Sequence, residues 1–129
     1  MRLFCAVVLA LLLPAATAAA KEENPARNCF ITSAWRGWSA PQGADALYLR
    51  VRTNDIYRVD LTPGTRIHRY GNDYLVNQVR GSSWVCSALD LDLALVDYNG
   101  GFRRGIVATN LRKLSPTEVA AIPREDLPY

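Results

Sequence analysis

The 129-residue sequence is poor in the side chains that most catalytic and metal sites require, with one histidine and three cysteines. A structural zinc site needs four ligands, chiefly Cys and His, and a redox site needs a Cys-x-x-Cys pair or an activated thiol. Neither pattern occurs, and no Gly-x-Ser-x-Gly turn surrounds Ser82 or Ser83. The sequence therefore predicts no metal and no cofactor, and it favours a non-catalytic protein.

Long apolar runs are also scarce, and the one that stands out lies at the N-terminus. Arg2 precedes an apolar run over residues 4–13, Pro14 ends it, and small residues follow up to Ala20. This order is typical of a secretory signal peptide, here predicted to be cleaved after Ala20. The run is about half of the roughly 20 residues needed to cross a bilayer. We therefore expect a periplasmic or secreted product, residues 21–129, without a membrane anchor.

Positive charge is only slightly in excess, with a formal net charge of +3. Removal of the signal peptide would lower this charge further, because Arg2 lies within it. Nucleic-acid binding relies on a concentrated positive charge. An exported chain with this balance is not expected to bind nucleic acid.

Of the three cysteines, Cys5 lies inside the apolar run and would leave with the signal peptide. Cys29 and Cys86 remain, and an even pair in a small exported chain predicts a disulfide. A bond between Cys29 and Cys86 would close a loop of 57 residues. In the loop-entropy model this lowers the entropy of the unfolded chain, which stabilises the fold by about 4 kcal/mol. We expect the bond to stabilise a small domain substantially.

Alternation of apolar and polar residues indicates β-strands along most of the mature chain. Residues 46–52 and 56–61 both alternate around the turn at 53–55, which predicts a β-hairpin. Further strands are expected at residues 29–31, 67–68, 74–76, 84–86, 90–96 and 102–108, with an Asn-Gly turn at 98–101 and a loop at 35–41.

One short helix is expected near the C-terminus. Ser115, Pro116 and Glu118 form a capping box with proline at the first helical position, and Pro123 ends the helix. Two turns are not stable alone, so Val119 and Ile122 should pack on the sheet.

The predicted fold is mostly β: a small antiparallel barrel or sandwich of about six short strands with one short C-terminal helix. We expect a signal peptide at residues 1–20, a flexible leader at 21–28, one β-rich domain at 29–122 and a tail at 123–129.

Four motifs follow one another along the chain. They are Cys-Phe at residues 29–30, Ile-Tyr-Arg-Val at 56–59, Gly-Ser-Ser-Trp-Val-Cys at 81–86 and Arg-Lys-Leu-Ser-Pro-Thr-Glu at 112–118. In this order they resemble a family of small exported bacterial proteins of unknown function, over about residues 28–122. Many members have two further cysteines, near Gly64 or Thr65 and near Gly105. The resemblance implies the fold class and export and implies no activity.

The outward face of the predicted hairpin is rich in arginine and tyrosine. Such side chains suit contacts with a sugar polymer or an anionic ligand, through stacking and forked hydrogen bonds. The sequence thus suggests a non-catalytic domain that binds an envelope protein or glycan, although tryptophans of small β domains are common in the core. The candidate surface comprises Tyr48, Arg50, Arg52, Arg58, Trp35, Arg36 and Trp38.

Two other functions stay open. A small hydrolase could assemble a scattered site from His68 with Asp73 or Asp92, and a structural or inhibitory protein could cap a partner. The acidic residues Asp90, Asp92 and Asp97 lack the spacing of a calcium loop. They fit better as a solvated strand face paired with arginines 103 and 104.

Overall fold

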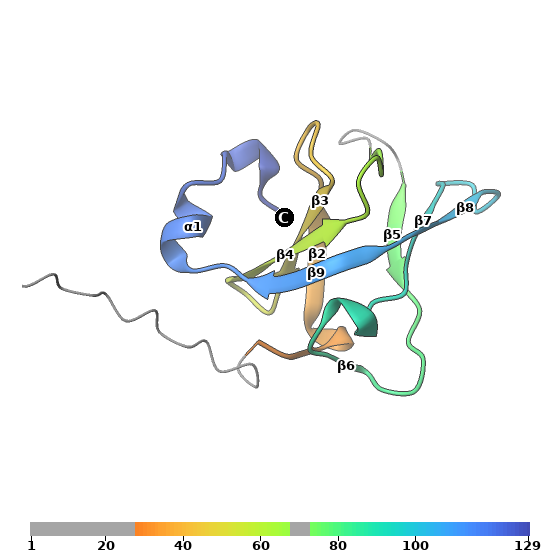
Figure 1. The fold of residues 1–129 in the computed structure, drawn as a ribbon, viewed down its shortest axis with the longest axis horizontal. Coiled ribbons are helices and arrows are strands. Elements are labelled where there is room, and N and C mark those ends of the chain that lie inside the picture. The colour runs from red at the N-terminus through yellow and green to blue at the C-terminus, as the bar shows by residue number, and fades with distance from the viewer. Residues whose placement is uncertain (1–27, 68–72) are drawn as a thin grey trace, which may run out of the picture.

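The computed structural model describes residues 28–67 and 73–129, and most of its regular structure is β, as the sequence predicts (Figure 1). The described strands are β1 (Phe30–Ile31), β2 (Trp35–Ser39), β3 (Ala46–Val51), β4 (Asp55–Leu61), β5 (Tyr74–Asn77), β6 (Trp84–Val85), β7 (Leu93–Val96), β8 (Arg103–Ile106) and β9 (Ala108–Lys113). The helical segments are α1 (Pro116–Ala120) and the short turns η2 (Thr32–Ala34), η3 (Ala88–Asp90) and η4 (Arg124–Asp126).

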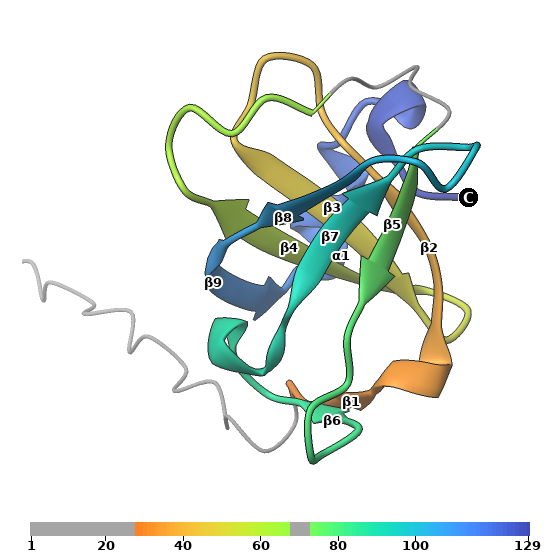
Figure 2. The ribbon, with the colours of Figure 1, turned by 90° about the vertical axis from the view of Figure 1, so that its right-hand side faces the viewer.

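The strands form three antiparallel sheets, in the orders β2-β3-β4-β9, β5-β7-β8 and β1-β6. The four-stranded sheet lies behind the three-stranded sheet in Figure 2, so the structure has the sandwich rather than the barrel of the two expected architectures. Buried side chains from both sheets form one core, which includes Leu47, Leu49, Leu93, Leu95 and Ile106. The two sheets are therefore held together by a shared apolar interior.

The predicted hairpin is confirmed as β3 and β4, with Leu49 opposite Tyr57. Leu47, Leu49 and Val51 are fully buried in the core, as the alternation requires. The chain turns through Arg52, which has a positive φ of 55° and pairs with Asp55 across the turn at 3.0 Å.

The loop expected at residues 35–41 is wrong over Trp35–Ser39, which forms β2 at the edge of the large sheet. Pairing with β3 shifts register between Trp35 and Gly37, so a bulge interrupts the period of two. Both Trp35 and Trp38 then pack against the core. The irregular pattern concealed this strand.

The strands of the second half are also bounded differently from the prediction. Residues 90–96 do not form one strand, since Asp90 ends the turn η3 and β7 begins at Leu93. The expected return strand at 102–108 divides at Val107 into β8 in the small sheet and β9 in the large one. No strand includes Ile67, and His68 lies outside the described residues.

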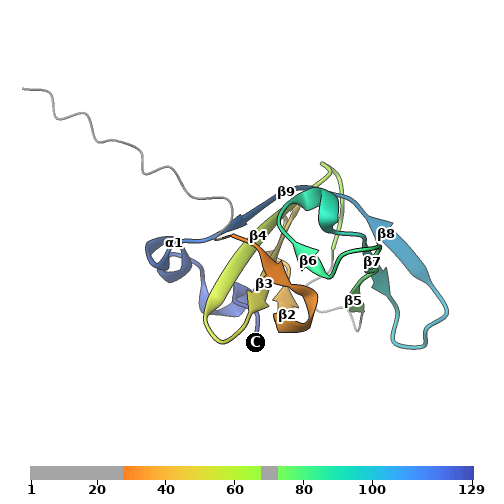
Figure 3. The same ribbon diagram turned by 90° about the horizontal axis from the view of Figure 1, so that it is seen from below.

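The predicted helix is confirmed as α1, capped by reciprocal hydrogen bonds between Ser115 and Glu118. Val119 and Ile122 pack against a second cluster of buried residues, Tyr48, Ile56 and Leu114. Figure 3 shows three layers, with α1 on one side of the large sheet and the small sheet on the other. The helix thus stays folded because it covers the outer face of the large sheet.

Residues 123–129, expected as a tail, pack against β2. The Ser39 hydroxyl donates to the backbone oxygen of Asp126 at 2.5 Å, and Pro128 is fully buried. A Cβ on Gly37 would lie 2.1 Å from the backbone oxygen of Tyr129. The close approach of this segment therefore depends on glycine at position 37.

Gly37→Ala should displace residues 124–129 from β2, because the added methyl group would overlap the backbone oxygen of Tyr129. We expect the free energy of unfolding to fall by about 1–3 kcal/mol and amide hydrogens of the displaced segment to exchange faster. Gly105→Ala is the control, since its new Cβ meets no atom within 4 Å. Equal hydrogen exchange in both variants would contradict this packing.

The predicted disulfide between Cys29 and Cys86 is present, with the two Cα atoms 4.2 Å apart. Phe30 lies opposite Val85 in the short β1-β6 pair, so the cysteines occupy the next positions of the same ladder. The bond therefore fastens the first described strand to the middle of the chain.

Candidate functional site

The C-terminal segment covers the candidate surface of the hairpin at Tyr48. Tyr48, Arg58 and Arg112 lie side by side on three neighbouring strands, β3, β4 and β9. Tyr48 is only 8% exposed, because α1 and the residues after it pack over this face. Tyr48 thus points away from the main core and is still buried, because a further layer covers that face of the sheet.

The arginines of that row already have acidic partners. The Arg58 guanidinium donates to Asp60 at 2.7 Å, and this bond is the main reason that its pKa is raised above the ordinary value. Arg112 pairs with Glu118 at 2.6 Å. Hydrogen bonds from Ser115 and Arg112 in turn lower the pKa of the Glu118 carboxyl. The Arg112–Glu118 pair fastens α1 to the sheet, and both pairs leave little unpaired charge for a ligand.

The other members of the candidate surface are spread over different parts of the molecule. Arg50 is half-buried, and its Nε has no hydrogen-bond partner among the described residues. Arg52 is held at the hairpin turn by Asp55, and Trp35 donates from its indole to the Gly37 oxygen at 2.8 Å. Trp38 is half-buried against the core, while Arg36 is exposed. The seven residues therefore do not form one open surface.

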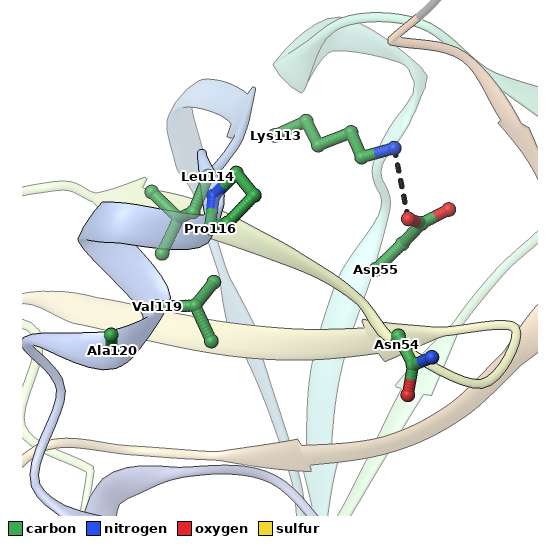
Figure 4. Close-up of a pocket in the computed structure, with 7 residues that line it drawn as sticks. All are labelled: Asn54, Asp55, Lys113, Leu114, Pro116, Val119 and Ala120. Carbon is green, nitrogen blue, oxygen red and sulfur yellow. Dashed lines mark ion pairs between the residues drawn. The ribbon is translucent and has the colours of Figure 1, made fainter.

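Two hollows flank α1. The larger, of about 490 Å³, lies between the β3-β4 turn and the helix, and Figure 4 shows Lys113 at its edge pointing toward Asp55. Burial raises the pKa of Asp55, but hydrogen bonds from Lys113 and Arg52 outweigh it and hold the pKa below 3.8. The rest of the lining is mainly apolar: Asn54, Leu114, Pro116, Val119 and Ala120.

The smaller hollow, of about 270 Å³, lies on the other side of the helix. Its polar lining consists of Tyr48, Arg58 and the Arg112–Glu118 ion pair. Neither hollow contains a nucleophile beside a base, which acyl-transfer chemistry would require. Both are consistent with the imperfect fit of a short helix on a sheet.

The three aspartates noted in the sequence each serve a separate local structure. Asp90 accepts hydrogen bonds from the backbone of Cys86 and Ser87, both at 2.9 Å. Asp92 pairs with Arg80 at 2.6 Å, and Asp97 accepts from the Gly101 backbone at 2.7 Å. The expected strand face is therefore wrong for all three aspartates, since β7 spans only Leu93–Val96. Arginines 103 and 104 lie opposite Val96 and Leu95 instead.

The hydrogen bonds from Cys86 and Ser87 lower the pKa of Asp90. A carboxylate with a lowered pKa stabilises the fold above its unfolded pKa, and this contribution is lost as the pH falls through the folded value. We expect the free energy of unfolding to fall less steeply below pH 4 in Asp90→Asn than in the wild type. Acid titrations of stability measure this.

Glu125→Gln is the control for that titration, because Glu125 is exposed and has no hydrogen bond among the described residues. Its pH dependence should match the wild type. Identical curves for all three proteins would mean that Asp90 does not hold the turn.

The hydrolase alternative concerns residues that the structure describes only in part. His68 lies outside the described residues. Asp92, one of its two suggested partners, is already paired with Arg80. Within residues 28–67 and 73–129, no three His, Cys, Asp or Glu side chains gather as a metal site would require.

An exposed surface on the small sheet was not predicted. Tyr74 on β5 and Tyr98 in the β7-β8 turn are 55% and 69% exposed, and their ring centroids lie 6.3 Å apart with planes inclined by 24°. Tyr74 lies opposite Val96, and Val96 lies opposite Arg103. We call Tyr74, Tyr98, Val96 and Arg103 the aromatic–arginine surface.

Arg103 is exposed and makes no ion pair within the described part of the chain. The neighbouring Arg104 lies opposite the buried Leu95, so its side chain starts on the inner face of the sheet. Its guanidinium donates to the backbone oxygen of Arg66 at 2.5 Å. Figure 2 shows the outer face of the small sheet toward the viewer, with no described element over it. The nearby Asp97 is engaged by Gly101.

The sequence held a signal for this surface. Tyr74 precedes the inward Leu75, and Tyr98 adjoins the Asn-Gly turn, positions where an aromatic side chain has no interior to enter. The signal was overlooked because the two tyrosines lie far apart in the sequence and meet only through the pairing of β5 with β7.

No protein-family model matches the chain, and no significant match is found among curated proteins or among solved structures. No helix within the described residues has the length and apolar character needed to cross a bilayer. The function is therefore argued from the residues themselves.

Proposed function

We propose that this protein is a non-catalytic binding domain for a component of the cell envelope, and that it contacts its ligand through the aromatic–arginine surface. The observation that carries the proposal is the exposed Tyr74–Tyr98 pair beside an unpaired Arg103. Aromatic and arginine side chains dominate the binding energy of many interfaces. The two rings leave apolar surface in contact with water, which a bound ligand would cover.

The proposed location is the periplasm or the extracellular space. The Cys29–Cys86 disulfide is consistent with an oxidising compartment. The signal peptide expected at residues 1–20 lies outside the described residues and remains a prediction.

The surface replaces the hairpin face that the sequence suggested. Arg52 and Arg58 of the hairpin, and Arg112 of the adjoining β9, are all engaged by carboxylates. A ligand there would have to displace those partners and the layer formed by α1. The small sheet requires no such rearrangement.

The test compares binding to separated envelope fractions: polysaccharide, protein and lipid. Immobilised wild-type protein should retain a component of one fraction, and Tyr74→Ala/Tyr98→Ala should lose at least about tenfold in affinity. Trp84→Ala is the control, since Trp84 is also an exposed aromatic residue but lies in the separate β1-β6 pair.

Unaltered folding of each variant is verified by its melting temperature. Equal binding by the double variant and the wild type would overturn the choice of surface. Retention of nothing from any fraction would overturn the proposed function.

A further inference from the structure

We infer that the ligand is a linear acidic polysaccharide that lies across the outer face of the small sheet. This inference rests on the proposed function and assigns the chemical class that the aromatic–arginine surface recognises.

The paired tyrosines provide the first part of the argument. Their planes are inclined by only 24°, and both rings are more than half exposed. The electron-rich face of an aromatic ring attracts weakly positive hydrogens. The C–H face of a sugar ring presents such hydrogens on a flat surface, so two adjacent and nearly parallel rings can support consecutive sugar units.

The shape of the sheet provides the second part. On the outer face, one cross-strand row runs from Tyr74 through Val96 to Arg103, and the next from Val76 through Ala94 to Gly105. A Cβ at Gly105 would meet no atom within 4 Å, so the chain is open to approach there. Ala94 at the centre of the second row is buried, so the open part of this face lies at Gly105, beside Arg103.

Charge provides the third part. Arg103 ends the row that Tyr74 begins, is exposed, and makes no ion pair among the described residues. A guanidinium forms two parallel hydrogen bonds with a carboxylate. Spacing the aromatic and cationic groups across one sheet fits a polymer that carries a carboxylate on its sugar units.

The acidic groups near this face do not neutralise it. Asp97 is held within the β7-β8 turn by the Gly101 backbone at 2.7 Å. Asp73 precedes Tyr74 and is half-buried. Neither forms an ion pair with Arg103, so the charge of its guanidinium is available to a ligand.

The probe is polygalacturonate, and the matched ligand is the same polymer with its carboxylates methyl-esterified. Calorimetric titration at low and moderate salt should give binding to the acidic polymer that weakens as salt rises. The ester should bind about tenfold or more weakly, because it retains the sugar rings and lacks the charge.

Three variants separate the contributions. Arg103→Gln should reduce affinity for the acid to about that for the ester, while Tyr98→Ala should weaken binding to both polymers. Arg36→Gln removes an exposed arginine from β2, on the other sheet, and should bind like the wild type.

Equal affinity for the acid and its ester would overturn the inference in favour of a neutral glycan. Equal losses in Arg103→Gln and Arg36→Gln would overturn it in favour of unspecific charge attraction. Retention of an envelope protein or lipid, with no polysaccharide bound, would overturn the acidic-glycan inference and leave the proposed binding function standing.

Discussion

Replacing both Cys29 and Cys86 with serine is expected to lower the free energy of unfolding by about 4 kcal/mol. The bond closes a loop of 57 residues, which contains β1 to β6 and so the whole β3-β4 hairpin. It also fastens β1, which pairs with β6 over only two residues. Two residue pairs cannot hold a strand by backbone hydrogen bonds alone.

Thermal unfolding of the double variant measures this loss. For a domain of this size, about 4 kcal/mol corresponds to a fall in melting temperature of roughly 15–30 °C. Reducing the wild-type protein with a thiol should reproduce the shift, and the same thiol should leave the double variant unchanged. A fall of only a few degrees would mean that β1 is held without the bond.

Phe30→Ala is expected to cost about 3–5 kcal/mol, the usual range for removing a buried aromatic side chain. Phe30 is fully buried, and its ring centroid lies 4.8 Å from that of Tyr57, at 60° between the planes. The contact joins β1 to the centre of the large sheet. Removing the ring leaves a cavity beside Tyr57 that the rigid strands cannot close.

A spectroscopic readout accompanies the loss of stability. Burial raises the pKa of the Tyr57 hydroxyl, so admitting water beside it should move that pKa back toward 10.0. Leu89→Ala is the control, because Leu89 is 95% exposed and its removal should change stability by less than about 0.5 kcal/mol. Similar unfolding energies for the two variants would contradict the assigned core.

Where one pattern alone determined the local structure, the sequence was sufficient. The β3-β4 hairpin follows from its alternation, and α1 follows from Ser115, Pro116 and Glu118 at capping positions. The disulfide follows from the two cysteines that lie outside the predicted signal peptide. Each of these features depends on neighbours in sequence or on a single chemical pairing.

The remaining strands depend on contacts that no local pattern contains. β2 is interrupted by a bulge between Trp35 and Gly37, and its tryptophans are partly buried against the core. β9 carries Thr109, Asn110 and Arg112, which are polar because much of that strand is only partly covered. It is a strand because β4 pairs with it.

The functional surface shows the same limitation. Tyr48 was expected outside because it alternates with Leu47 and Leu49, yet a third layer covers it. Tyr74 and Tyr98 become neighbours only when β5 pairs with β7. A sequence gives the face of a strand, while the layers above that face decide its exposure.

The most direct test of the central proposal is a map of amide chemical shifts by nuclear magnetic resonance, as the protein is titrated with the envelope fraction that it retains. We predict that the largest changes fall on residues 74–76 and 96–105, around Tyr74, Tyr98 and Arg103. Changes concentrated on residues 113–120 beside the larger hollow, or on β2, would contradict the account.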